Sequence, residues 1–364
     1  MKPYIAVIAA SKGYMPGLAA FINSFRIHHE GRNIRIIVCD YDLPDEFKEK
    51  YAGPDLEFQK VASRYGNIWA TKIERFRVAT EQKGAVVGVF DSDMFCCASM
   101  YNLWQIAEAG LIVGGSNASN IRFGSNWNES YKMDVPDIFD YKTITSVPTF
   151  MDIDQHGEVW HSLYEHKKAT NAGADFNLVN IMLMKLGKMD YIVTIPAEQV
   201  TGIHHFQIKP DTRVIDKAGK LLTNNGLELM CVHGRYWEGN WYSNLMKPMP
   251  KHCARLGVRS SKSRAYQGAI QSRELLKGEF DKYCDWPYES TVKPETLANL
   301  ATEESLYFVE ADSVEEELQK LEELNLKLNG QLSRQERIIR NLQREQTRVG
   351  AYDSEPEGEE ANDN

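Results

Sequence analysis

Residues 85–93, Ala85-Val86-Val87-Gly88-Val89-Phe90-Asp91-Ser92-Asp93, form an apolar run that ends in two carboxylates. A continuous apolar run predicts a strand buried on both faces of a parallel sheet, here over Ala85 to Phe90. Because strand side chains alternate, Asp91 and Asp93 point the same way at the carboxyl end of that strand. Ligands of open α/β sheets bind at this end.

Two such carboxylates can hold Mg²⁺ or Mn²⁺, while an isolated Asp-x-Asp is also a common solvated turn. The apolar stretch Met94 to Cys97 follows directly. Charges so closely flanked by buried sequence need a counter-ion, which favours the metal site.

Outward from this stretch, the chain alternates strands and helices. Apolar runs predict strands at 5–10 and 34–39, and helical spacing predicts helices over 18–25 and 69–82. This order predicts an α/β fold with a doubly wound, Rossmann-like, mostly parallel sheet. A region with weak periodicity, 114–170, is predicted to be loop-rich and to lie over a site. Further along, the pattern predicts a helix at 177–186 and strands at 191–195 and 227–232.

Composition excludes several classes of protein. Of 364 residues, 43% are hydrophobic and 26% charged, which is a globular balance and not that of a collagen-like or wholly disordered chain. The net charge of −9 includes six carboxylates within 353–364, so the body is nearly neutral and its total charge does not indicate nucleic-acid binding. Bases between Lys247 and Arg264 could form a phosphate-facing stripe, although a solvated surface is the simpler interpretation.

Six scattered cysteines do not form a disulfide framework, and no apolar stretch approaches the roughly 20 residues of a membrane helix. We therefore expect a cytoplasmic protein.

The C-terminal segment 314–349 carries a heptad pattern with alternating spacings of four and three. It predicts a coiled coil and a homo-oligomer, while a single helix packed on the body would show a similar stripe. The expected domains are 1–250, a C-terminal extension over 251–312 that packs on it, a coiled coil over 313–349 and a disordered acidic tail over 350–364.

Several motifs occur in an order that resembles the metal-dependent glycosyltransferases of the GT-A fold, in particular the glycogenin-like enzymes of glycosyltransferase family 8. The resemblance covers roughly residues 4–245. Besides the acidic pair, the matching segments are Ala9 to Leu18, Thr71 to Arg75, Asp175 to Asn180 and Val232-His233-Gly234.

This resemblance implies a metal-dependent transfer of a sugar from a nucleotide-sugar donor, a UDP-sugar, with retention of anomeric configuration. The metal ligands that it implies are Asp91, Asp93 and His233, and the metal is Mn²⁺, with Mg²⁺ as the alternative, since an imidazole suits Mn²⁺ better. It places Asp175 beside the transferred sugar as the catalytic residue. Its implied donor-binding residues are Ala9, Tyr14, Lys72, Asp91, Ser92 and Gly234, with Tyr14 stacking on uracil.

The chain also departs from the family pattern. Phe176 replaces an expected glutamine, and Gly234-Arg235 lacks the Lys-Pro-Trp run that usually follows. The base that binds the diphosphate therefore stays open among Lys72, Arg235 and Lys247.

Plainer interpretations stand beside these roles. Tyr14 could pack on the first helix, Lys72 could be a solvated charge, His233 a core histidine and Asp175 a helix cap. The other functions considered are nucleotidyl transfer that makes a sugar nucleotide, and a non-catalytic coiled-coil assembly protein. The sequence leaves the acceptor open among a glycan, a protein side chain, a small molecule and a modified base.

Overall fold

The computed structural model describes residues 2–62, 72–116, 124–136, 143–200, 214–223, 225–237 and 264–288. All of them belong to one compact unit, Met1–Ala298, whereas a second unit, Asn299–Asn364, contains none of the described residues. The predicted coiled coil and acidic tail lie outside the described residues. So does Lys247, together with the basic stretch up to residue 263.

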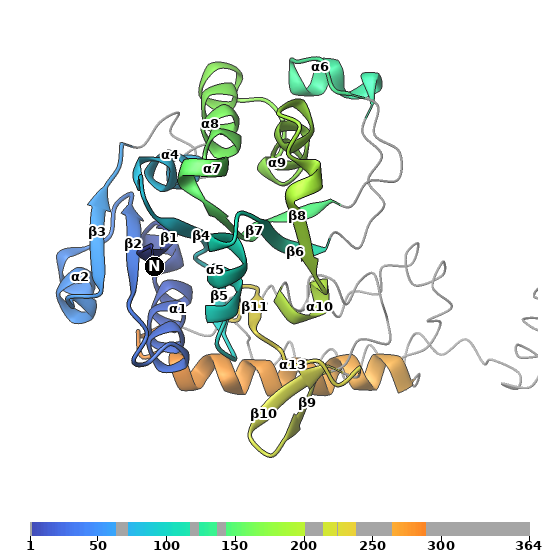
Figure 1. Ribbon diagram of the computed structural model, residues 1–364. Helices are drawn as coiled ribbons and strands as arrows, with labels where there is room; N and C mark the ends of the chain where they lie inside the picture. Colours follow the sequence, from blue (N-terminus) through green and yellow to red (C-terminus); the bar gives the residue numbers. More distant parts are fainter. Residues whose placement is uncertain are drawn as a thin grey trace, which may run out of the picture. The chain divides into compact units, whose positions relative to one another are not determined.

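A seven-stranded sheet with the order β3-β2-β1-β4-β7-β6-β8 forms the centre of the first unit (Figure 1). Its strands pair in parallel except for β7, which is antiparallel to both β4 and β6. The sheet confirms the predicted mostly parallel α/β class. Its strands are β1 (Tyr4–Ala10), β2 (Ile34–Asp40), β3 (Leu56–Lys60), β4 (Val86–Asp91), β6 (Ile112–Ser116), β7 (Ile144–Asp152) and β8 (Ile192–Ile195).

Helices cover both faces of this sheet. In Figure 1, α4 (Glu74–Glu81), α8 (Glu158–Thr170) and α9 (Asp175–Lys185) lie on one side, and α1 (Met15–His28) and α5 (Tyr101–Glu108) lie on the other. Shorter helices connect these elements: η1 (Lys12–Tyr14), α2 (Asp45–Tyr51), η2 (Ser125–Trp127), α6 (Asn128–Tyr131), α7 (Ile153–His156), η3 (Met189–Tyr191) and α10 (Ala197–Val200).

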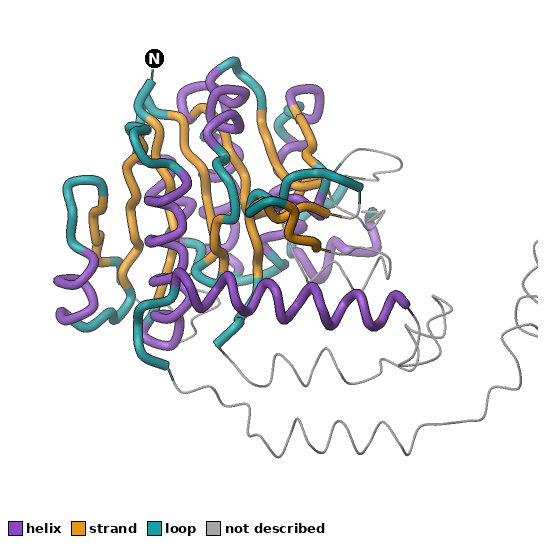
Figure 2. The backbone as a smooth tube through the Cα atoms, turned by 90° about the horizontal axis from the view of Figure 1, so that it is seen from below, coloured by secondary structure: helices purple, strands orange, loops and turns teal. Residues whose placement is uncertain are grey.

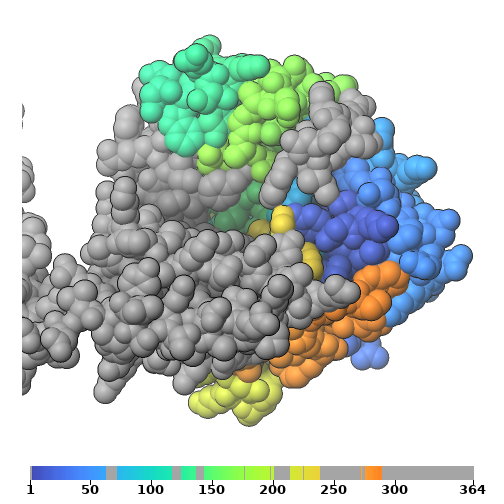
Figure 3. Space-filling view, turned by 180° about the vertical axis from the view of Figure 1, so that it is seen from behind, coloured from blue at the N-terminus to red at the C-terminus, as the bar shows by residue number. Residues whose placement is uncertain are grey.

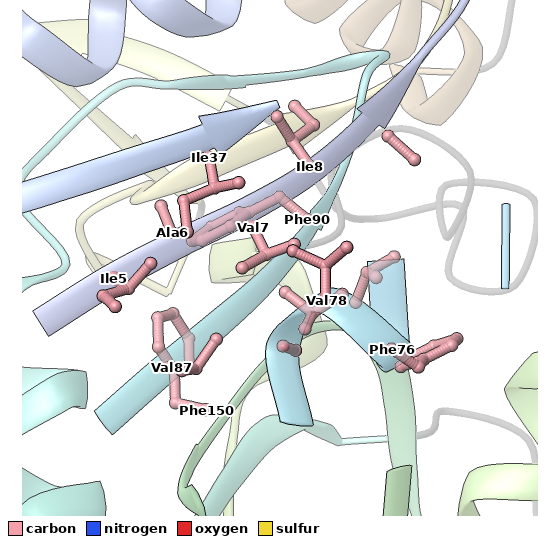
Figure 4. Packing of buried hydrophobic residues seen from close by; sticks show 14 of the residues in the cluster. Ile5, Ala6, Val7, Ile8, Ile37, Phe76, Val78, Val87, Phe90 and Phe150 are labelled. Atoms are coloured by element: carbon pink, nitrogen blue, oxygen red, sulfur yellow. The ribbon is translucent and has the colours of Figure 1, made fainter. Parts of the chain in front are cut away.

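The core forms where β1 is buried along its whole length. Side chains of β2, β4, β7 and α4 belong to the same buried cluster as those of β1. Figure 4 shows Ile37 and Val78 beside β1, and Phe150 beside Val87. An apolar strand between two parallel neighbours explains why the sequence shows an unbroken hydrophobic run instead of alternation.

The prediction of a loop-rich centre over 114–170 is wrong for much of the described part of that region. Strand β7 was missed because Thr145, Ser146 and Thr149 give it a polar appearance, although all three are buried. Helix α8 was missed as well, although Val159, Trp160, Leu163 and Tyr164 form a helical stripe on its buried face.

Two small antiparallel pairs lie beside the main sheet. Strand β5 (Met94–Cys96) pairs with β11 (Cys231–His233), and β9 (Val214–Lys217) pairs with β10 (Lys220–Thr223). A strand was predicted at 227–232. The observed strand β11 begins four residues later, at Cys231, and ends one residue later, at His233.

Helix α13 (Arg264–Tyr283), which the sequence did not reveal, lies beside α1 as one long helix in Figure 2. Within the described residues, no helix has the length and apolar character that a membrane crossing requires.

Candidate metal and donor site

Three potential metal ligands meet where β4 ends and β11 ends. Asp91 is the last residue of β4, and Asp93 follows two positions later, just before β5. His233 is the last residue of β11, and the ladder sets it opposite Met94, next to Asp93. The amide of Gly234 donates a hydrogen bond of 2.7 Å to the carbonyl of Asp93, which fixes the two segments against each other.

The side chains of this Asp91–Asp93–His233 cluster lie close together. His233 Nε2 is 3.0 Å from Asp93 Oδ1 and 3.5 Å from Asp91 Oδ2. One ligand atom from each residue lies within 4.8 Å of the other two, and no other group of three metal-binding side chains in the described ranges meets this test. Neighbouring ligands of an octahedral ion bound at about 2.1 Å are about 3 Å apart, so the cluster fits a divalent cation.

The donor set also fits the chemistry of such an ion. Two carboxylates and one imidazole supply oxygen and nitrogen, and imidazole is a better ligand for Mn²⁺ than for Mg²⁺. Asp91 and Asp93 are both buried, with 8% and 7% of the residue surface exposed. Buried carboxylates of this kind need compensating positive charge.

Positive side chains surround the two aspartates. Arg75, at 1% exposure, forms an ion pair with Asp91 and a second one, of 2.8 Å, with Asp175. Lys72 Nζ lies 3.6 Å from Asp91, and Arg235 Nε lies 3.9 Å from Asp93. The site therefore combines a potential cation site with a rim of bases that suits a polyanionic ligand.

These neighbours shift the protonation equilibria of the cluster. Burial raises the pKa of Asp91, but Arg75, Lys72 and His233 outweigh it and hold that pKa far below its usual range. Burial likewise opposes the ionised form of Asp93, and the charge of His233 lowers its pKa overall. Burial lowers the pKa of His233, yet Asp93 and Asp91 together raise it. Both aspartates are thus ionised, as metal ligands must be.

Arg75 is the residue of this site to which the sequence gave no role. It lies three positions after Lys72, which belongs to the turn before α4, and both bases pair with Asp91. Arg75 belongs to the segment Thr71 to Arg75 that matches the family motif, but the sequence analysis gave a donor-binding role only to Lys72. Helix α4 begins at Glu74 and positions Arg75 under the end of β4.

Asp175 is brought to the same site by α9. The idea that it caps this helix is wrong, because Ala174 occupies the N-cap and Asp175 is the first helical residue. Its carboxylate instead accepts from Arg75.

The remaining predicted donor residues also come together here. Ala9 lies beside Asp91 in the β1–β4 ladder, and Ser92 is 1% exposed between the two aspartates. Tyr14 is buried and two cations lie near its ring, with Lys72 Nζ 5.3 Å and Arg235 Cζ 4.7 Å from its centroid. The ring of Tyr14 is packed inside the fold and also borders the basic side chains of the site. Its position is therefore compatible with a packing role and with a donor-binding role.

An aromatic cluster of Tyr14, Trp237 and Phe280 packs next to these basic side chains. Trp237 meets Tyr14 edge-on at 6.0 Å and stacks on Phe280 of α13 at 5.9 Å. Gly17 of α1 lies so close to Trp237 and to the Ser92 carbonyl that a methyl group there would lie 2.3 Å from that oxygen. In Figure 3 the segment that contains α13, in orange, lies next to the N-terminal segment, in blue. The helix that sequence analysis missed therefore helps to build the site.

A further cavity lies elsewhere, between α4 and α8. It has a volume of about 660 Å³ and is lined largely by charged residues, among them Arg77, Glu81, Glu158 and Lys168. These pair with neighbouring side chains, as Arg77 does with Glu81 at 2.5 Å and Lys168 with Glu165 at 3.5 Å. None of the residues predicted for the site lines it.

Comparison with known proteins gives distant structural matches. No family model matches the sequence, and no curated protein matches it either. The galactosyltransferase LgtC, solved with donor and acceptor sugar analogues, matches with a TM-score of 0.47 at 12% identity over 73% of this chain and 99% of its own. The bifunctional glycosyltransferase WbbM gives 0.44 at 13% over 78% of this chain and 52% of its own. GlyE of Streptococcus pneumoniae TIGR4, also a glycosyltransferase, gives 0.39 at 11% over 80% and 66%.

Proposed function

We propose that this chain is a metal-dependent glycosyltransferase of the GT-A type that transfers a sugar from a nucleotide-sugar donor. The observation that carries the proposal is the Asp91–Asp93–His233 cluster at the carboxyl end of β4, bordered by Lys72, Arg75 and Arg235. A cation site next to several bases is what binding and departure of a diphosphate require.

Each residue of the site has a proposed role. Asp91, Asp93 and His233 hold Mn²⁺, which supplies positive charge to the diphosphate when bound. Lys72 and Arg235 bind donor phosphate oxygens, and Arg75 holds Asp91 and Asp175 in place. Tyr14 borders the nucleoside, and Ala9 and Gly234 bring backbone close to the donor. The diphosphate leaves with its charge neutralised by groups that are already oriented, so little reorganisation is needed.

We further propose that the sugar is transferred with retention of its anomeric configuration. This proposal rests on the order of the motifs, which resembles that of the glycogenin-like enzymes. Asp175 then lies near the transferred sugar and does not act as the base for an inverting attack. NMR of the product anomer tests this step, because an inverted product would assign the role of base to Asp175 or to another acid.

The central experiment measures Mn²⁺ binding and UDP-sugar hydrolysis or transfer in Asp93→Ala. We expect the variant to fold and to lose both properties, while Glu49→Ala, which removes an exposed carboxylate on α2, keeps them. Full activity in Asp93→Ala would refute the metal assignment. A wild-type chain that no nucleoside diphosphate stabilises in the presence of Mn²⁺ would favour the non-catalytic assembly protein.

We also propose that residues 314–349 make the protein a homo-oligomer. The proposal rests on the heptad pattern of the sequence alone. Light scattering of the full chain and of a chain ending at Asp312 tests it. We expect an oligomer only for the full chain, and two monomers would contradict the proposal.

A further inference from the structure

Three buried hydroxyl groups lie around one small recess at the carboxyl end of the sheet. Ser11 follows β1, Tyr41 follows β2 and Ser92 follows β4, and these strands are neighbours in the sheet. All three residues line the same cavity, together with Ala9, Ala10, Tyr14 and Lys72. The recess thus borders the metal cluster, because Ser92 is the residue between Asp91 and Asp93.

None of the three hydroxyl oxygens has a hydrogen-bond partner in the part of the chain that the structure describes. Ser11 and Ser92 are 6% and 1% exposed, and the Tyr41 hydroxyl is buried although its ring is partly accessible. A buried hydroxyl without a partner is unfavourable, and nearly all such groups in folded proteins are satisfied. Three of them around one space indicate that a polar group from outside the described chain satisfies them.

The size of the recess limits what can enter. Its volume is about 10 Å³, which is close to the space of a single water-sized group. A nucleobase ring is too large for this space, but one hydroxyl group fits. A hydroxyl both donates and accepts, so it matches a lining made of other hydroxyls.

We propose that Ser11, Tyr41 and Ser92 form a recess that binds one ribose hydroxyl of the donor, and that Tyr41 is a specificity-determining residue for that hydroxyl. This inference rests on the proposed function. A site that is built to hydrogen-bond a substrate hydroxyl rejects the analogue that lacks it, because its own polar groups are then left unpaired. The recess would therefore select ribonucleotide donors over deoxy analogues.

The test compares UDP with 2′-deoxy-UDP and 3′-deoxy-UDP in the presence of Mn²⁺, by calorimetry on the full chain. We expect wild-type protein to bind UDP about threefold to tenfold more tightly than one of the two deoxy analogues, as for one neutral hydrogen bond. Tyr41→Phe and Ser11→Ala should weaken UDP binding and reduce that preference. Tyr191→Phe, a change at an exposed tyrosine of η3, is the control and should change neither quantity.

Thermal unfolding without ligand separates ligand recognition from a structural role. Because the Tyr41 hydroxyl has no partner among the described residues, Tyr41→Phe should not lower the melting temperature of the free protein. A lowered melting temperature with unchanged UDP affinity would show that the hydroxyls hold a structural water, and would overturn the inference.

Three further outcomes would also overturn the inference. Altered discrimination between UDP and CDP in Tyr41→Phe, with unchanged discrimination against both deoxy analogues, would mean that the recess reads the base. Unchanged binding of all analogues in both variants would remove the recess from recognition while leaving the proposed function intact. Failure of wild-type protein to bind any nucleoside diphosphate would refute the proposed function itself, and the recess assignment with it.

Discussion

The guanidinium of Arg75 binds the carboxylates of Asp91 and Asp175 at the same time, and thereby joins the end of β4 to the first turn of α9. Arg75 is almost completely buried, whereas Asp175 is partly accessible. One planar fork can orient two carboxylates in this way, which a lysine ammonium does less well. One side chain thus links the metal cluster to Asp175, the proposed catalytic residue.

Replacement of Arg75 is expected to affect stability and activity together. Arg75→Ala leaves Asp91 buried without its closest cation and should lower the free energy of unfolding by roughly 3–5 kcal/mol. Arg75→Lys keeps the charge and should lose less stability, but it should still lower the transfer rate. Denaturant unfolding and turnover of both variants provide the measurement.

The matched control for this prediction is Arg35→Ala, because Arg35 forms an exposed ion pair of 3.7 Å with Glu57. Its loss should cost no more than about 1 kcal/mol. Equal stability of Arg75→Ala and Arg35→Ala would contradict the role given to Arg75.

Gly17 is expected to tolerate no larger residue. The methyl group of Gly17→Ala would lie 2.3 Å from the Ser92 carbonyl and 2.5 Å from the Trp237 ring. We expect a loss of about 1–3 kcal/mol from this overpacking, together with weaker nucleotide binding. Gly13→Ala is the control, since nothing lies within 4 Å of the corresponding position. The prediction fails if both variants show the same melting temperature and the same affinity for UDP.

His233 is expected to set both the affinity and the selectivity for the metal. His233→Ala removes one of the three proposed ligands and should weaken Mn²⁺ binding by at least about tenfold. His233→Asp replaces nitrogen by oxygen, so its preference for Mn²⁺ over Mg²⁺ should fall relative to wild type. Titration of both ions into the three proteins measures this, and an unchanged preference would argue that His233 does not ligate.

A pH dependence of stability is expected from His29, away from the metal cluster. Burial, chiefly, lowers the pKa of His29 to about 4, and its Nε2 accepts a hydrogen bond of 3.0 Å from the Met100 amide. The unfolded chain binds a proton at this residue below a pKa of about 6.5, whereas the folded chain does not. Stability should therefore fall as the pH drops from about 6.5 to about 4, by up to roughly 3 kcal/mol.

Unfolding free energies of wild type and His29→Gln between pH 7 and pH 4.5 measure this contribution. The variant should show a smaller slope, because its side chain cannot titrate. Parallel curves for the two proteins would assign the acid sensitivity to other groups.

The burial of His29 shows a limit of what its local sequence can predict. The pair His28-His29 near a helix end suggests a surface role, but His29 is 5% exposed and bonds to backbone at both ring nitrogens. Nothing in the local sequence reveals this, since Met100 approaches from a distant segment.

The parallel half of the fold was predictable for a physical reason. Strands that are buried on both faces, such as β1 and β4, show unbroken apolar runs, and polar residues at their carboxyl ends mark the ligand edge. The antiparallel strand β7 was not predictable in this way, because its buried threonines and serine resemble loop composition. The cluster Asp91, Asp93 and His233 followed from motif order, whereas the ion pairs of Arg75 and the recess lined by Tyr41 depend on tertiary contacts.

The β5–β11 ladder has a thermodynamic consequence for the metal. Asp93 and His233 are 140 positions apart in the chain, and only the pairing of these two strands brings them together. An unfolded chain would have to close a very long loop to gather the same ligands, so an ion held by the proposed site would bind the folded chain almost exclusively. Free energy of metal binding is then also free energy of folding, and added Mn²⁺ should raise the melting temperature in proportion to the logarithm of its concentration.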